Sequence, residues 1–317
     1  MSPLAVCRVQ DLGVSPETSR WLIEGLWADQ AVGIVGGEPK CGKSFLALDL
    51  AVAVASGAPC LRRFPPTQTG PVLLFAAEEA LPVVRRRLEG IAQAAGVAFA
   101  ALDLHVITTP SLRLDLAEDR HRLQETVAAL RPRLLVLDPF VRLHRIDENA
   151  VAEVVPLLAY LRDLQRAFAT AVLLVHHARK GAGHVRAGQA LRGSSERHAW
   201  GDSNLYLRRR GDVLLLTVEH RAAPAPSGLA LELRACGDAL ALHVVDLAAR
   251  PLLERTTAPT ALDRIEHALA HAPLPLSLRQ LRHVCRLRMA TLCEALTTLR
   301  TEGRVLKAAG GYQLTPR

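Results

Sequence analysis

The residues best suited to chemistry lie in one glycine-rich stretch. Residues 37–44 read GEPKCGKS and match G-x-x-x-x-G-K-[ST] at every fixed position. An apolar run before this stretch and an alanine-rich apolar run after it predict a strand, a loop and a helix in that order. Glycine allows close backbone approach, and the amides and dipole of a new helix favour phosphate. The residues expected to bind ATP are Gly37, Glu38, Pro39, Lys40, Cys41, Gly42, Lys43, Ser44 and Phe45.

Three side chains add the chemistry of hydrolysis to this loop. Lys43 is expected to reach the β- and γ-phosphates, and Ser44 to ligate Mg²⁺. The aliphatic run at 134–137 ends on Asp138, the Walker B pattern, and a carboxylate at that strand end can hold a Mg²⁺-bound water against Ser44.

A second pair of acids follows the apolar run at 72–77. Glu78 is expected to polarise the attacking water, and Glu79 to cap the helix that begins near Leu81. The alternative is that either glutamate only caps that helix. Parallel strands present their carboxyl ends at one edge of a sheet, so we expect Glu78 and Asp138 to lie on the nucleotide side.

A third polar strand end carries His176 and His177, after the apolar run at 171–175. Such side chains can contact the γ-phosphate and report its loss. Adjacent side chains on a strand point to opposite faces, so a shared metal site is not expected. The next segment, 179–195, is rich in glycine and basic residues. Lys180, Arg186 and Arg192 lie there and are expected to contact DNA phosphates, unless the segment is an ordinary solvated loop.

The bulk composition fits a globular protein with a basic balance. The chain has 317 residues, 50% of them hydrophobic, a mean hydropathy of +0.16 and a net charge of +8. Six scattered cysteines lack metal-ligand spacing and indicate a reduced compartment. We expect a cytoplasmic protein without a signal peptide or a membrane span, because no apolar run reaches about 18 residues.

The order of the expected elements gives an α/β fold. The apolar runs and helices predict a mostly parallel sheet, extended by antiparallel strands between 205 and 245. We expect an ATPase domain at 1–250 with an N-terminal helical segment starting at Ser15, followed by a linker at 251–262.

Residues 263–317 predict a separate small domain. Three helices, the second capped by Ser277, precede a short hairpin, and together they describe a winged helix. Arg286 and Arg288 are expected to face duplex DNA. Winged helices also serve as protein-docking modules, so that alternative stays open.

These motifs together resemble one known group. From about Trp21 to Val245 the chain is similar to the RecA-like P-loop ATPases of the RepA-type hexameric replicative helicases, which are related to the DnaB and KaiC families. The resemblance rests on GGEPKCGKS, the strand ending at Glu78, LLVLDPF, LVHHARKG with the following RGSS, and VEHR.

The resemblance implies roles for individual residues. Glu78 resembles the general base, His177 the sensor that couples γ-phosphate to DNA, and the segment 180–192 the channel loop that faces single-stranded DNA. Arg221 lies where ring relatives insert an arginine finger into the neighbouring site. Glu219 stands where DnaB-like members carry a lysine, so Arg192 and Arg208 remain alternative fingers.

Two functions follow from this interpretation. The first is an ATP-hydrolysing motor of a plasmid or mobile element, a hexameric ring that translocates on single-stranded DNA. The second is an ATP-switched DNA-binding scaffold or regulator. A filament-forming recombination mediator is a third and weaker possibility. Each of them needs ATP, Mg²⁺ and a homo-oligomer, and none needs a membrane.

Overall fold

The protein consists of two compact units. The computed structural model describes residues 6–11, 20–148, 150–177, 199–211, 213–226, 228–237, 239–245, 261–272, 274–285, 287, 289–308 and 310–315. The units are Met1–Asp246 and Leu247–Arg317, and each is treated by itself. Within the described residues, no helix combines the length and the apolar character that a bilayer crossing needs.

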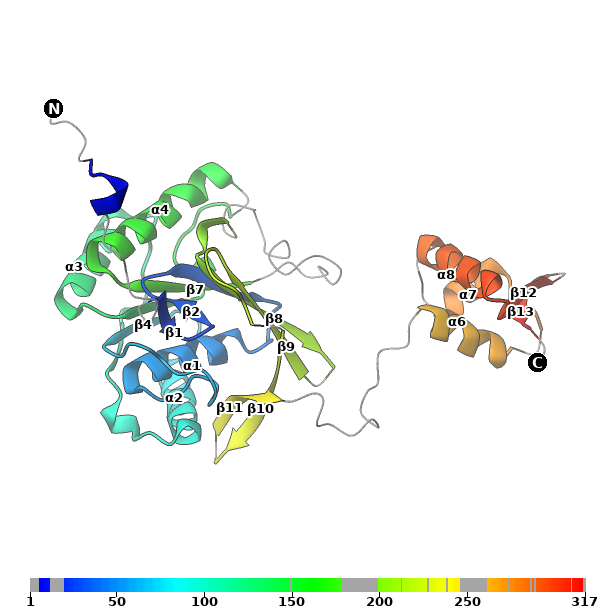
Figure 1. Ribbon diagram of the computed structural model, residues 1–317, viewed down its shortest axis with the longest axis horizontal. Coiled ribbons are helices and arrows are strands. Elements are labelled where there is room, and N and C mark those ends of the chain that lie inside the picture. The colour runs from blue at the N-terminus through cyan, green and yellow to red at the C-terminus, as the bar shows by residue number, and fades with distance from the viewer. Residues whose placement is uncertain are drawn as a thin grey trace. The chain divides into compact units, whose positions relative to one another are not determined.

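Nine of the described strands of the first unit form one large sheet (Figure 1). Its strands are β3 (Val32–Gly37), β4 (Val72–Ala76), β5 (Leu104–Val106), β6 (Leu134–Asp138), β7 (Ala171–His177), β8 (Ser203–Arg210), β9 (Val213–His220), β10 (Leu229–Cys236) and β11 (Ala239–Val245). They lie in the order β11-β10-β9-β8-β3-β7-β6-β4-β5. The strands from β8 to β5 pair in parallel, and β8 to β11 pair antiparallel. The expected sheet class is confirmed.

Helices cover both faces of this sheet. They are α1 (Lys43–Ser56), α2 (Leu81–Ala95), α3 (Ala117–Leu130) and α4 (Val151–Phe168). Successive side chains of β6 point to opposite faces: Leu134 and Val136 pack in the cluster with α1 and α2, while Leu135 and Leu137 pack with α3 and α4. Figure 1 shows the two helix pairs on opposite sides of the sheet. Burial on both faces explains why the central strands read as continuous aliphatic runs.

The N-terminal region differs from the expected helical segment. Residues around Trp21 form a hairpin of β1 (Trp21–Ile23) and β2 (Trp27–Ala28). Its apolar side chains are buried, with Trp27 only 1% exposed. The expected helix start at Ser15 lies outside the described residues. A short helix η1 (Val9–Asp11) precedes it.

A histidine ties this hairpin to the main sheet. His220, the last residue of β9, lies 3.0 Å from Ser203 Oγ through Nδ1 and 3.1 Å from the Gly25 carbonyl through Nε2. Ser203 Oγ also accepts the Ala28 amide at 3.0 Å. The one tautomer that satisfies all three contacts is neutral, with the proton on Nε2, and burial lowers the pKa of His220 accordingly.

The β8–β9 hairpin is longer than the sequence suggests. The polar sequence RRRGD at 208–212 predicts a turn, but the arginines at 208–210 lie on β8 and pair with residues 213–215 of β9. The turn contains Gly211, whose φ of 61° is left-handed. The extended β8 therefore carries Arg209 up to the phosphate loop.

The second unit packs three helices against a hairpin. They are α6 (Ala261–Ala270), α7 (Leu278–Cys285) and α8 (Met289–Thr301), followed by β12 (Val305–Ala308) and β13 (Gly311–Leu314). Ile265, Leu281 and Leu299 are fully buried in its core. Ser277 caps α7 as expected: its Oγ accepts the Gln280 amide at 3.4 Å, and Gln280 Oε1 accepts the Ser277 amide at 2.9 Å. The linker residues 251–260 lie outside the described residues.

Candidate nucleotide-binding site

The glycine loop lies between β3 and α1, at the carboxyl edge of the parallel strands. Gly37 ends β3, and a Cβ there would lie 2.3 Å from the Leu207 carbonyl oxygen and 2.8 Å from Cys41 Sγ. Gly42 precedes α1 with a left-handed φ of 84°. Side chains at these two positions would either clash or strain the backbone. The loop therefore needs both glycines to reach the helix N-terminus.

Lys43 lies inside the loop. Its side chain is 4% exposed, and Nζ donates a hydrogen bond to the Glu38 carbonyl at 2.7 Å. Burial lowers the pKa of Lys43, and the nearby charges of Cys41 and Asp138 oppose that shift. A buried ammonium held by a backbone carbonyl at a helix N-terminus is suited to an incoming anion.

Ser44 and Asp138 meet across the start of α1. Asp138 ends β6 in register with Ala76 of β4, and its carboxylate forms a side-chain hydrogen bond with Ser44. Burial, followed by the charges of Glu79 and Glu78, raises the pKa of Asp138 to about 6. A buried carboxylate with two further carboxylates nearby is a place where a bound cation would offset the negative charge.

The donor set fits Mg²⁺. Mg²⁺ takes oxygen ligands, commonly one or two carboxylates together with phosphate oxygens and waters. The Ser44 hydroxyl and the Asp138 carboxylate supply that chemistry. No group of three or more His, Cys, Asp or Glu side chains in the described part of the chain could hold a metal without the nucleotide.

Glu78 stands between two basic side chains. It follows β4, and its Oε1 lies 3.0 Å from Arg142 Nε on the short helix η4 (Phe140–Arg142). Its Oε2 lies 4.0 Å from His177 Nε2 at the end of β7. The structure thus brings the candidate base, the candidate sensor and Asp138 to one sheet edge.

Glu79 has a different role from the one expected. The N-cap of α2 is Ala80, and no side chain caps it. Glu79 instead pairs with Arg87 at 2.5 Å, and the Arg87 guanidinium lies 4.6 Å from the centroid of the Phe45 ring. The prediction of a Glu79 cap was wrong, because an arginine two turns into the helix offers a stronger partner than the helix amides.

The side chains of the two histidines at the end of β7 lie in different surroundings, as predicted. His176 is 2% exposed, and its ring lies 6.1 Å from that of Phe140. His177 lines the nucleotide pocket.

The pocket gathers most of the expected residues and adds others. It has a volume of about 460 Å³. Its lining includes Pro39, Lys40, Gly42, Lys43, Ser44, Phe45, Glu78, Asp138 and His177. Sequence reasoning missed Arg87, Arg209, Leu214 and Leu233, which also line it. Arg209 donates to the Lys40 carbonyl at 3.4 Å. The run of three arginines was the available signal, but its placement in a turn hid it.

Arg221 lies at the other end of the sheet. Ser203 of β8 pairs with Gly33 of β3 and with His220 of β9. Gly37 lies four residues from Gly33 in one direction, and Arg221 follows His220 in the other direction. Arg221 is therefore more than four residues from Gly37 along the strands, or at least about 13 Å. Arg221 pairs with Asp202 at 3.3 Å and donates to the Ala199 carbonyl.

The candidate DNA contacts lie outside the described residues, as does the segment 178–198. These candidates are Lys180, Arg186, Arg192, Arg286 and Arg288.

This combination of sheet order, glycine loop and strand-end carboxylates defines a P-loop ATPase domain with a RecA-like fold. Residues 2–183 match the AAA domain family (AAA_25), and because they are more than half of the chain, the protein belongs to that family. Two solved structures share the fold. One, the ATPase domain of another protein, has a TM-score of 0.52 at 12% identity, over 65% of this chain and 82% of that one. The RadB recombinase has a TM-score of 0.50 at 17% identity, over 69% and 92%.

Proposed function

We propose that this protein is an ATP-hydrolysing, ring-forming motor that translocates on single-stranded DNA, a helicase of the RepA type. The observation that carries the proposal is the position of Glu78 beside His177, 4.0 Å apart. His177 ends the strand that leads directly into the basic segment at 178–198. The candidate general base therefore lies beside the residue after which the candidate DNA segment begins.

Five side chains of the pocket have a part in hydrolysis. Lys43 and the loop amides bind the phosphates, and Lys43 offsets charge on the transferred group. Ser44 and Asp138 would hold Mg²⁺, which supplies electrostatic stabilisation of the phosphate oxygens when it is bound. Glu78 orients a water and accepts its proton. His177 holds Glu78 and responds to the loop that follows it.

The position of Arg221 calls for a second subunit. Arg221 is too far along the sheet to reach the pocket of its own chain, so as an arginine finger it acts on a neighbour. Asp202 and the Ala199 carbonyl hold its guanidinium in the isolated subunit. A ring would place it against the pocket of the next subunit, where a cation lowers the barrier to phosphoryl transfer.

A mixing experiment tests this proposal. Lys43→Ala and Arg221→Ala should each be inactive in steady-state ATP hydrolysis with single-stranded DNA. Mixed in equal amounts, they should recover part of the wild-type rate, because an intact Lys43 site then meets an intact Arg221 neighbour. A mixture of Lys43→Ala with Glu78→Gln is the matched control and should stay inactive, since both changes affect the same site.

The outcome separates the proposed motor from a scaffold. Recovery of activity, together with DNA stimulation and strand separation by the wild type, supports the motor. Slow hydrolysis that ignores DNA and shows no complementation, with duplex binding retained, would instead favour an ATP-switched scaffold that contacts duplex DNA through its C-terminal unit.

A further inference from the structure

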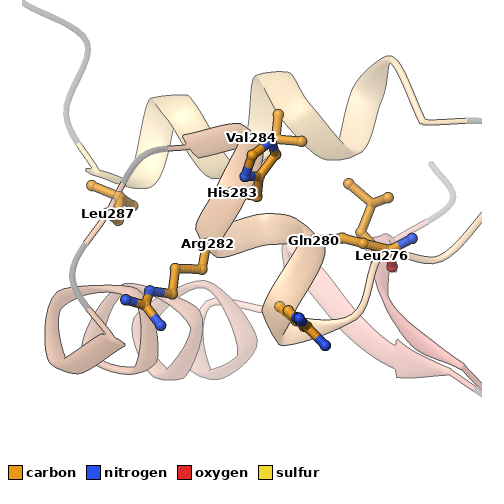
Figure 2. Close-up of a pocket in the computed structure, with 7 residues that line it drawn as sticks. Leu276, Gln280, Arg282, His283, Val284 and Leu287 are labelled. Carbon is orange, nitrogen blue, oxygen red and sulfur yellow. The ribbon is translucent and has the colours of Figure 1, made fainter.

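The second unit carries a hollow along α7 that the nucleotide site does not use. The hollow has a volume of about 770 Å³. Its lining consists of Leu276, Arg279, Gln280, Arg282, His283, Val284 and Leu287. Figure 2 shows these side chains following α7, with Leu276 and Gln280 at one end, Leu287 at the other, and Arg282, His283 and Val284 between them. The hollow is defined here as the α7 groove.

The α7 groove is strongly basic. Arg279 and Arg282 are exposed on the same helix, one turn apart. From His267 to Cys293 the sequence contains no aspartate or glutamate. Uncompensated cations on a short helix create a positive potential that attracts an acidic ligand.

The α7 groove is also apolar. Val284 is 58% exposed although it lies between the buried residues Leu281 and Cys285. Leu276 and Leu287 are half-buried at the two ends of the groove. Apolar side chains on an exposed helix face, set among cations, are typical of a surface that packs against an apolar partner.

The neighbouring helix does not offer the same chemistry. The exposed side chains of α8 include both an acid, Glu294, and a base, Arg300. The hydroxyls of Thr297 and Thr298 donate to carbonyls of their own helix, at 2.9 and 3.2 Å. These hydroxyls are therefore engaged within α8 rather than presented to phosphates, and the charge of Glu294 repels phosphates from that face.

We propose that the α7 groove binds an acidic amphipathic helix of a partner protein. Carboxylates on one face of such a helix pair with Arg279 and Arg282, and its leucine-type side chains cover Val284 and Leu287. Nucleic acid satisfies only the first half of this chemistry, because phosphates leave the apolar side chains exposed. The proposal is independent of ATP hydrolysis, and it assigns the second unit to recruiting a protein.

The test uses the full chain and a fluorescein-labelled synthetic helical peptide. One face of the peptide carries glutamates and the other carries leucines. A second peptide has the same glutamates with serine in place of leucine, and a 20-base-pair duplex serves as the nucleic-acid probe. Fluorescence anisotropy is measured with wild type, Arg279→Glu/Arg282→Glu, Val284→Ser and the matched control Arg300→Glu on α8. Circular dichroism verifies that every variant is folded.

We expect the leucine peptide to bind wild type and Arg300→Glu equally. The double charge reversal should weaken binding at least about fivefold. One exposed ion pair contributes up to about 1 kcal/mol, which corresponds to that factor in the dissociation constant. Val284→Ser and the serine peptide should each bind more weakly as well. The proposal is overturned if the serine peptide binds as tightly as the leucine peptide. It is equally overturned if the duplex binds and the charge reversal removes that binding while the leucine peptide does not bind.

Discussion

The contact between Arg142 and Glu78 makes a prediction about basal turnover. The guanidinium lies 3.0 Å from Glu78 Oε1, and the two side chains are 62% and 38% exposed. The Glu78 oxygen that accepts from this guanidinium faces η4 rather than an attacking water. In the proposed mechanism, Arg142 restrains the general base Glu78 until a DNA phosphate competes for the Arg142 guanidinium. Arg142→Ala should raise ATP hydrolysis in the absence of DNA.

The size of this effect follows from the exposure of the pair. An exposed ion pair contributes about 0.2–1 kcal/mol, because solvent screens it. If the pair is broken on the way to the transition state, removing it lowers the barrier by the same amount. With tenfold in rate for each ~1.4 kcal/mol, turnover should rise by roughly 1.4-fold to 5-fold. The gain in turnover over the wild type should be smaller at high salt, because salt already screens the ion pair in the wild type.

The assay is steady-state ATP hydrolysis without DNA at low and high salt. Arg145→Ala is the matched control, because Arg145 is an exposed arginine three residues further along the chain. The gain should vanish when Glu78→Gln is combined with Arg142→Ala. DNA stimulation should also be smaller in Arg142→Ala than in wild type. A tenfold fall in basal turnover would refute the reasoning, since it would mean that Arg142 promotes the reaction.

Three further predictions concern the fold around the site, and urea unfolding measures each. Arg62→Ala leaves the buried Asp49 carboxylate without the guanidinium 2.6 Å away, and should cost about 3 kcal/mol; an unchanged midpoint would contradict this. Gly33→Ala places a Cβ 1.7 Å from the Ser203 carbonyl oxygen, so it should cost at least about 3 kcal/mol unless β8 can separate from β3. Because burial lowers the pKa of His220, its contribution to stability is present above pH ~6.5 and lost as pH falls through the folded pKa; the midpoint of His220→Gln should vary less in that window.

Local pattern was sufficient for the sheet and for most of the nucleotide loop. Aliphatic runs that end on a polar residue correctly predicted β4, β6 and β7, because a strand buried on both faces has few polar residues until it leaves the core. The same runs placed Glu78, Asp138 and His177 at one edge, because parallel strands share their polarity. The pattern of apolar residues and the shared direction of the parallel strands are therefore sufficient to place these three side chains.

The partners of individual side chains could not be predicted in this way. Glu79 was predicted to be a cap because α2 follows it, yet Arg87 holds it from the next turns of that helix. Arg142 meets Glu78, 64 positions away in the sequence, only because η4 follows β6 and β6 pairs with β4. Side-chain pairing of this kind depends on tertiary packing, and no short pattern encodes it.

The arrangement of β7 and β8 around β3 explains how one sheet can serve two tasks. The phosphate loop follows β3 at the centre of the sheet, where Asp138 from β6 and His177 from β7 line the same pocket on one side. On the other side, the antiparallel turn from β8 into β9 sends Arg209 to the pocket and returns the chain to the opposite edge, where Arg221 follows. A purely parallel connection would have left both arginines at the same edge. The antiparallel strands thus place the phosphate site and Arg221 at opposite edges of the sheet, which is the geometry that the proposed shared active site requires.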